Sequence, residues 1–253
     1  MKKIRMLIGV FLCLLLLPGF QNQDDAEQEE ILSLIVPCPV IAVVRQTAAK
    51  YQTYDETAGR IGVFEPGTKV EILQDRSAQW YRVRKLGEED TAWVMRASLY
   101  IPADDPPSRD LLTKTQLEQY MNLKGFESET AYFILTDIYR QLTYIFSGEK
   151  ENWSLIKTIT CSTGKNESPT TRGLFKIGER GEWFYSERLG SGSMYWMRFN
   201  GSYLFHSVAM DQNRKIIDNV IGDRRSMGCI RLELADAKWL YLTIPEKTSV
   251  FVT

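Results

Sequence analysis

Short apolar runs bounded by turn-forming residues recur from residue 40 to the end of the chain, and they restrict it to a mainly β fold. The strongest local signal is Asn200-Gly201, because a type I′ turn needs positive φ at both central positions and these residues tolerate it. The dipeptide predicts a hairpin joining strands over 195–199 and 202–207. Side chains alternate along a strand, so Leu204 and His206 are expected on one face and Phe205 on the other.

The first half of the chain is expected to form a separate unit over residues 38–103. Its strands are predicted at 40–45, 60–64, 69–74, 79–83 and 92–95, a spacing typical of a small barrel. The segments 67–73, 80–83 and 92–94 resemble a bacterial SH3-like domain, a family that often binds cell wall or positions an attached enzyme. Trp80 and Trp93 are interpreted as core aromatics, with an exposed ligand platform as the alternative.

A charged, proline-containing segment over 103–110 marks the domain boundary, within a linker that spans 104–127. The linker is expected to contain one short helix over 112–123, capped by Thr113 or Thr115. A second domain over 128–253 is predicted to be β-rich. Its further expected elements are strands at 131–137, 141–146, 153–160, 173–177, 193–198 and 248–252 and a helix at 235–242.

The amino terminus predicts export. Three basic residues precede an apolar run over 6–20, the pattern of a secretory signal peptide over residues 1–20. No small-x-small cleavage motif follows, so a retained membrane tether through 6–20 is the alternative. Residues 21–37 are acidic and polar and are interpreted as a solvated spacer. The expected location is extracytoplasmic.

Composition excludes several function classes. The net charge is −1, with 31 basic and 32 acidic residues, so no overall positive field is available for nucleic acid. A single histidine and no Cys-x-x-Cys spacing argue against a zinc site, and neither a metal nor another cofactor is expected. The oligomeric state is left open.

The chemistry-bearing residues cluster in the last quarter of the chain. His206 is the only histidine, and Cys229 follows it by 23 positions within Ser226-x-Gly228-Cys229-x-Arg231. A cysteine beside a base is the minimal set for nucleophilic catalysis. Arg231, with the pair at 224–225, is expected to favour the thiolate if these cations lie near the sulfur.

The number of cysteines leaves room for one disulfide beside a free thiol. Outside the apolar run there are three cysteines, Cys38, Cys161 and Cys229, and an odd number in an exported protein suggests one free thiol. A disulfide between Cys38 and Cys161 is left open. For each residue alone, a plain structural role is the commoner case, as a small buried hydrophobe or an ordinary core histidine.

The pattern His206-Ser207 followed by Ser226-x-Gly228-Cys229-Ile-Arg231-Leu resembles the signature of the L,D-transpeptidase (YkuD-type) catalytic domain. Residues 161–165, 168–175 and 236–241 resemble further motifs of that family, in the family's order, and the resemblance covers about residues 128–253. It implies a β-sandwich-like domain with one or two short helices. It also implies a bacterial enzyme that cross-links peptidoglycan stem peptides at the cell wall or the outer face of the cytoplasmic membrane.

The resemblance implies that Cys229 is the nucleophile, that His206 accepts and returns the proton, and that Arg231 anchors charge near the acyl site. The backbone N–H groups of Gly228 and Cys229 are expected to stabilise the oxyanion. The ordinary pKa values of the two reactive groups, about 6.5 and about 8.5, are close enough for an imidazolium–thiolate pair to be expected.

Supporting roles are less defined. Ser207 is expected to orient the imidazole through its main chain or hydroxyl. Ser226, Tyr195 and Trp196 are candidates for substrate contact, with purely structural roles equally open, and Arg172 has no expected role beyond that of a solvated charge.

Two rival functions remain. Hydrolysis of the same acyl-enzyme would make the protein an L,D-carboxypeptidase, and a non-catalytic wall-binding module could retain the fold. A papain-like protease is disfavoured because its cysteine precedes its histidine, whereas here the histidine comes first.

Overall fold

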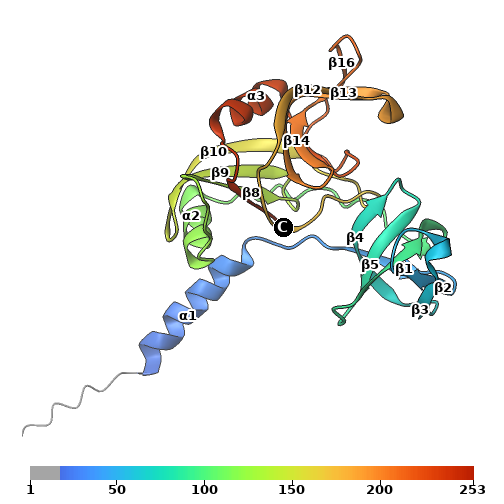
Figure 1. The fold of residues 1–253 in the computed structure, drawn as a ribbon. Helices are drawn as coiled ribbons and strands as arrows, with labels where there is room; N and C mark the ends of the chain where they lie inside the picture. Colours follow the sequence, from blue (N-terminus) through green and yellow to red (C-terminus); the bar gives the residue numbers. More distant parts are fainter. Residues whose placement is uncertain (1–17) are drawn as a thin grey trace, which may run out of the picture.

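The computed structural model describes residues 18–253, which form a mainly β protein with three α-helices (Figure 1). Almost all of the predicted signal peptide or anchor therefore lies outside the described residues. Within residues 18–253, no helix is long and apolar enough to cross a membrane.

The spacer predicted over 21–37 is largely helical. Helix α1 spans Pro18–Ser33, and its residues 25–30 are exposed as a solvated segment should be. The prediction underestimated the helix-forming tendency of its Glu, Gln and Ala residues. Near its end Ile31 and Leu32 pack against a buried cluster of the second domain, which holds the last turn in place.

Residues 40–100 form the N-terminal sheet, a seven-stranded sheet in the order β3-β2-β6-β5-β4-β1-β7. All five predicted strands are present, with ends within two residues of those expected; β2 and β7 were not predicted. The strands are β1 (Val40–Val44), β2 (Ala48–Tyr51), β3 (Arg60–Phe64), β4 (Lys69–Arg76), β5 (Trp80–Lys85), β6 (Thr91–Met95) and β7 (Leu99–Tyr100).

The prediction that Trp80 and Trp93 fill the core of this unit is wrong. Their strand neighbours Tyr81 and Val94 occupy the core, and alternation turns both indoles to the opposite face. Both tryptophans are half-buried, each packed edge-on against a tyrosine ring with centroids 5.3 Å apart.

The second domain is built on an eleven-stranded sheet that folds over a common core. One half has the strand order β11-β18-β8-β9-β10, and the other half continues as β17-β14-β13-β15-β16, with β12 beside β13. The first half contains β8 (Tyr132–Asp137), β9 (Leu142–Glu149), β10 (Asn152–Ser162), β11 (Gly173–Lys176) and β18 (Ser249–Val252). The second contains β12 (Arg180–Ser186), β13 (Ser191–Asn200), β14 (Tyr203–Ser207), β15 (Ala209–Met210), β16 (Ile216–Asp218) and β17 (Ile230–Leu232).

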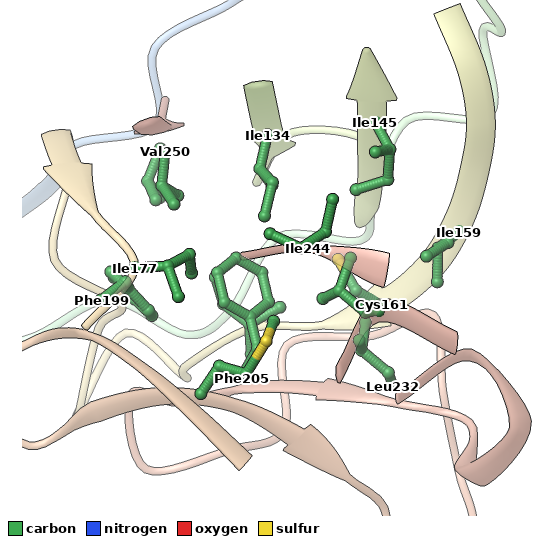
Figure 2. Close-up of a cluster of buried hydrophobic side chains, with 14 of the residues drawn as sticks. Ile134, Ile145, Ile159, Cys161, Ile177, Phe199, Phe205, Leu232, Ile244 and Val250 are labelled. Atoms are coloured by element: carbon green, nitrogen blue, oxygen red, sulfur yellow. The ribbon is translucent and has the colours of Figure 1, made fainter. Parts of the chain in front are cut away.

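The core lies between these two halves, as the predicted sandwich-like fold requires. Figure 2 shows Ile134 and Ile145 of the first half directed toward Phe205 of the second, with Ile244 beside them. Burying each such side chain contributes about 1.5–3 kcal/mol. Helix α3 (Leu234–Thr243) follows β17 and contributes buried Leu240 to the same cluster.

Helix α2 (Lys114–Leu123) covers the outer face of β8–β10. Of the two predicted caps, Thr113 is the N-cap: its hydroxyl accepts from the Gln116 N–H, and the Gln116 side chain accepts from the Thr113 N–H. This reciprocal capping box satisfies two backbone donors that the helix leaves unpaired. Leu117 and Met121 are buried beneath the helix, at the predicted helical spacing.

The hairpin that ends in His206 is present, but its turn lies one residue later than predicted. Asn200 pairs with Tyr203, so Gly201 and Ser202 occupy the centre of the turn. Only Gly201 has positive φ, at 49°, which excludes the type I′ turn expected at Asn200-Gly201. The prediction that Phe205 and His206 lie on opposite faces of this strand is confirmed, because Phe205 belongs to the core cluster and His206 does not.

Candidate active site

Two parallel strands bring the candidate residues together. Strand β14 pairs with β17 in a register that sets Phe205 beside Ile230 and His206 beside Arg231. Paired residues of neighbouring strands share a face, so His206 and Arg231 lie on the face opposite the core. Cys229 immediately precedes β17, and its thiol donates to the carbonyl of Ser202, the residue before β14. The tertiary structure thus joins residues that are 23 positions apart in sequence.

The imidazole of His206 is buried and has a defined tautomer. Its Nδ1 lies 2.6 Å from the Ser207 carbonyl oxygen, and since a carbonyl only accepts, Nδ1 carries the proton and Nε2 carries the lone pair. Burial lowers the pKa of His206 from 6.5 to about 4; the hydrogen bond to Ser207 opposes this, and the charge of Arg231 adds to it. Phe184 packs edge-on against the ring, with centroids 5.7 Å apart.

The thiol of Cys229 is half-buried and its sulfur lies 3.7 Å from the Ser202 carbonyl oxygen, to which it donates. In the described part of the chain no hydrogen bond joins this thiol to His206. Burial raises the pKa of the Cys229 thiol, against the lowering effects of the Leu204 backbone N–H, Arg231 and Arg198.

These two pKa shifts contradict the expected imidazolium–thiolate pair. Burial disfavours the charged form of each group, which moves the pKa of the thiol up and that of the imidazole down. At neutral pH the resting state is therefore a neutral thiol and a neutral imidazole whose Nε2 can accept a proton. Such a site suits proton transfer concerted with nucleophilic attack.

The cations near the sulfur differ in part from those predicted. Arg231 lies beside His206 and donates to Asp218, with 3.0 Å between Nη1 and Oδ2. Arg225 binds the same carboxylate at 2.8 Å, whereas Arg224 donates to Asn166. The second cation that acts on the thiol is Arg198 of β13, which sequence reasoning missed because it lies 31 positions before the cysteine.

The loop before Cys229 is tightly braced. Gly228 has φ +107°, and a Cβ there would lie 2.7 Å from the Tyr203 ring, so no other residue fits. Its carbonyl accepts from the Thr170 hydroxyl at 2.7 Å. Its N–H donates to the Ser226 hydroxyl at 3.1 Å, which corrects the expectation that this N–H is free for an oxyanion.

Ser226 and Ser207 are both structural hydroxyls. Buried Ser226 accepts from Gly228 and donates to the Cys229 carbonyl, closing the loop on itself. The Ser207 hydroxyl accepts from the Met194 N–H at 2.9 Å and donates to a neighbouring carbonyl. Ser207 therefore orients the imidazole through its main chain, whereas its hydroxyl ties β14 to β13.

The two aromatic candidates lie on opposite faces of β13. Met197 pairs with Phe205 in the core, so Trp196 lies on the face of His206. Tyr195 packs instead against Tyr241 of α3, with ring centroids 5.7 Å apart. Tyr195 is thus directed away from the cysteine, which contradicts the expected substrate contact, and Trp196 stays a candidate.

Arg172 is not a solvated charge, as the sequence suggested. It is ion-paired with Glu71 of β4, whose side chain is 7% exposed and which also binds Arg84 at 2.7 Å. Sequence reasoning missed this pair because the two residues are 101 positions apart. The contact connects the N-terminal sheet to the segment that carries Thr170.

The cysteines Cys38, Cys161 and Cys229 are all free thiols. Cys161 is fully buried in the core of the second domain, whereas Cys38 is half-buried. The disulfide left open by the sequence is therefore not present.

Comparison with known proteins identifies the family of this chain. The family model of the YkuD L,D-transpeptidase catalytic domain matches residues 131–252. The curated protein "Putative L,D-transpeptidase YciB" of Bacillus subtilis is 36% identical over 150 residues, which cover 56% of this chain and 73% of that protein.

Solved structures were also compared. A fused Zn-dependent amidase/peptidase/peptidoglycan-binding domain-containing protein from Clostridium acetobutylicum shares 31% identity, with a TM-score of 0.49, over 59% of this chain and 65% of that one. An L,D-transpeptidase from Stackebrandtia nassauensis shares 22% identity, with a TM-score of 0.40, over 56% of this chain and 67% of that one. On the family-model match and the Bacillus relative, this chain belongs to the YkuD-type L,D-transpeptidase family.

Proposed function

We propose that this protein is an exported peptidoglycan L,D-transpeptidase that forms cross-links through an acyl-enzyme on Cys229. The observation that carries the proposal is the β14–β17 register, which pairs His206 with Arg231, two residues after Cys229. The buried imidazole of His206, whose Nε2 carries the lone pair, and the partly exposed Cys229 that precedes the paired strand support nucleophilic acyl transfer.

In the proposed reaction, the Cys229 sulfur attacks the carbonyl carbon of an L-to-D peptide bond while the thiol proton passes to His206 Nε2. The C–N bond then breaks, and the departing D-amino acid takes that proton from the imidazolium. The amine of a second stem attacks the thioester, loses a proton through His206, and releases the thiolate, which is reprotonated. Each half-reaction leaves the enzyme's protonation state unchanged.

Two groups would stabilise the charges formed during these steps. The Cys229 backbone N–H is the remaining candidate donor to the oxyanion, since that of Gly228 is bound to Ser226. Arg231 is held by Asp218 and would offset negative charge as it develops. Trp196, on the same face, is proposed to contact the stem peptide.

Acylation by a carbapenem tests the nucleophile, because its strained β-lactam carbonyl is an acyl donor that does not require a second substrate. Intact-mass spectrometry should show one adduct on the wild-type protein. Cys229→Ala should show none, and Cys161→Ala, which removes the fully buried thiol, should still be acylated. An adduct that persists in Cys229→Ala, or the absence of any wild-type adduct, would contradict the assignment.

The rival carboxypeptidase uses the same acyl-enzyme but transfers it to water. Muropeptide analysis of cell wall incubated with the protein separates the two: cross-links between third residues support the transpeptidase, and trimmed tripeptides support the hydrolase. Wall binding without either product or an adduct would instead support a non-catalytic module.

The remaining assignments complete the proposal. Residues 1–20 would be a signal peptide or membrane tether that directs export. The N-terminal sheet would be an SH3-like domain, and residues 128–253 the catalytic domain. Fractionation of a bacterium expressing the full chain should recover it outside the cytoplasm, and replacement of the basic residues at positions 2, 3 and 5 should retain it inside.

A further inference from the structure

A polar cavity of about 300 Å³ lies between the N-terminal sheet and the catalytic loop. The turn between β4 and β5 supplies one wall, and the hairpin and loop around the candidate nucleophile supply the other. Its lining includes Asp75, Arg76, Arg188, Ser202, Tyr203 and Met227. Cys229 does not line the cavity itself, but its thiol donates to the carbonyl of the lining residue Ser202 at 3.7 Å, so one residue links the cavity to the thiol.

The wall from the N-terminal sheet is held firmly in place. Asp75 accepts from the Ser168 hydroxyl at 2.7 Å, across the boundary between the two units. Tyr81 donates to the Glu167 carbonyl at 2.6 Å, and Arg96 is ion-paired with the Glu167 side chain at 2.9 Å. Three contacts to two adjacent residues fix the turn relative to the catalytic domain, so the cavity is preformed.

The cavity lining contains two arginines and one acidic residue, so the protein neutralises its positive charge only in part. Within residues 18–253 neither Arg76 nor Arg188 has a carboxylate within 4.0 Å, whereas Arg96, Arg225 and Arg231 are each ion-paired. The Arg76 guanidinium lies over the Tyr54 ring, 4.9 Å from its centroid, which restricts it without neutralising it. Asp75 is the acidic residue in the lining, and its two oxygens already accept from Ser168 and Ala78.

Arg76 and Arg188 both line this cavity, and arginine binds a carboxylate through paired N–H donors. We propose that this cavity is a subsite for a free carboxylate of the stem peptide, so that the N-terminal sheet takes part in substrate recognition through Arg76, opposite Arg188 of the catalytic domain. The subsite rests on the proposed function, because Ser202 links the cavity to Cys229 and the stem peptide is the substrate proposed to react there.

Two carboxylates could occupy this subsite: the terminal one of the leaving D-amino acid and, in a stem whose third residue has an acidic side chain, the one on that side chain. Peptides amidated at one position or the other distinguish these sources. Binding is measured by titration calorimetry in the full chain carrying Cys229→Ala, so that the result does not depend on turnover.

The unamidated peptide should bind at least about tenfold more tightly than one of the two amidated forms, the loss expected when a charge-assisted hydrogen-bond pair is removed. Adding Arg76→Ala and Arg188→Ala should abolish this preference, because only the binding of the unamidated peptide should weaken. Replacing both residues by lysine instead (Arg76→Lys and Arg188→Lys) should restore part of the preference. Arg60→Ala, an exposed arginine on β3, is the matched control and should bind as the parent does.

The proposed subsite would be contradicted by equal affinity of the protein for all three peptides. It would also be contradicted if the double variant lost the same amount of affinity for the unamidated and the amidated peptides. Circular dichroism of each variant confirms that the fold is intact. Failure of the proposed function gives a different result: the wild-type protein would then lack a carbapenem adduct and stem turnover, whatever the affinities for the three peptides.

Discussion

Arg172 of the catalytic domain is ion-paired with Glu71 of the N-terminal sheet, and Glu71 is nearly buried between this arginine and Arg84. Two residues before Arg172, Thr170 holds the carbonyl of Gly228, next to the candidate nucleophile. The N-terminal sheet is therefore connected to the catalytic loop through a short series of side-chain contacts. Four predictions follow from this arrangement and from the burial of the two reactive groups.

Glu71→Gln should destabilise the protein, because it leaves two arginines facing a neutral amide. Breaking a fully buried pair costs about 3–5 kcal/mol, and since both arginines are partly exposed we expect about 1–3 kcal/mol. Chemical denaturation measures the loss. Glu89→Gln is the matched control: it also binds Arg84, at 3.4 Å, but its side chain is 95% exposed, so it should change stability very little. Equal effects of the two substitutions would rule out a special role for Glu71.

Thr170→Val keeps the side-chain shape and removes a hydroxyl that accepts from the Gly164 N–H at 2.8 Å and donates to the Gly228 carbonyl at 2.7 Å. Both partners would be left unpaired in a buried site, at about 1–3 kcal/mol. Carbapenem acylation should slow by about tenfold or more, because small displacements of a reacting group are costly. Thr171→Val, half-buried and next in the chain, should acylate at the wild-type rate. An unchanged rate in Thr170→Val would show that the loop does not depend on this contact.

Gly228→Ala should abolish acylation. The left-handed φ of +107° costs a non-glycine residue about 1–3 kcal/mol, and the new methyl group would lie 2.7 Å from the Tyr203 ring. The loop must shift to relieve this contact, which displaces the neighbouring thiol. Gly190→Ala is the control, because it has positive φ but nothing within 4 Å of its Cβ position. Stopped-flow measurement of the acylation rate and thermal unfolding of both variants separate loss of activity from loss of stability. Full acylation activity in Gly228→Ala would contradict the tight packing of Gly228 against Tyr203.

The pKa of His206 should be measurable without ambiguity, because it is the only histidine. Burial lowers its pKa from 6.5 to about 4, so between these values the unfolded chain binds a proton that the folded protein does not. The free energy of unfolding should therefore fall as pH decreases below 6.5, by about 1.4 kcal/mol per unit and about 3 kcal/mol in all.

The lowered pKa of His206 also determines the pH below which the acylation rate should fall. The imidazole must be neutral to accept the thiol proton, so acylation should persist well below pH 6.5 and decline toward about pH 4. NMR titration of the single imidazole and a pH series of acylation rates provide the two measurements. An NMR pKa near 6.5 would show that the ring is solvated rather than buried.

Much of the fold follows from local sequence patterns. Five of the seven strands of the N-terminal sheet and seven of the eleven in the second domain were predicted, with ends within three residues, because alternation and turn chemistry are encoded within a few positions. The Thr113 cap and the buried side of α2 follow from helical spacing in the same way. The very short strands β15, β16 and β17 have too few residues to show such a pattern and were missed, as was the longer β12.

The identities of the candidate nucleophile and base follow from the sequence, since one histidine and one motif-embedded cysteine leave little choice. The pKa values and protonation states of these two groups depend on the tertiary structure alone. Burial depends on what packs around a residue, and it made the resting pair neutral, whereas the free pKa values predicted an ion pair. Arg172 became an interdomain ion pair rather than a solvated charge for the same reason: its partner Glu71 lies 101 positions away, and only the folded chain brings the two together.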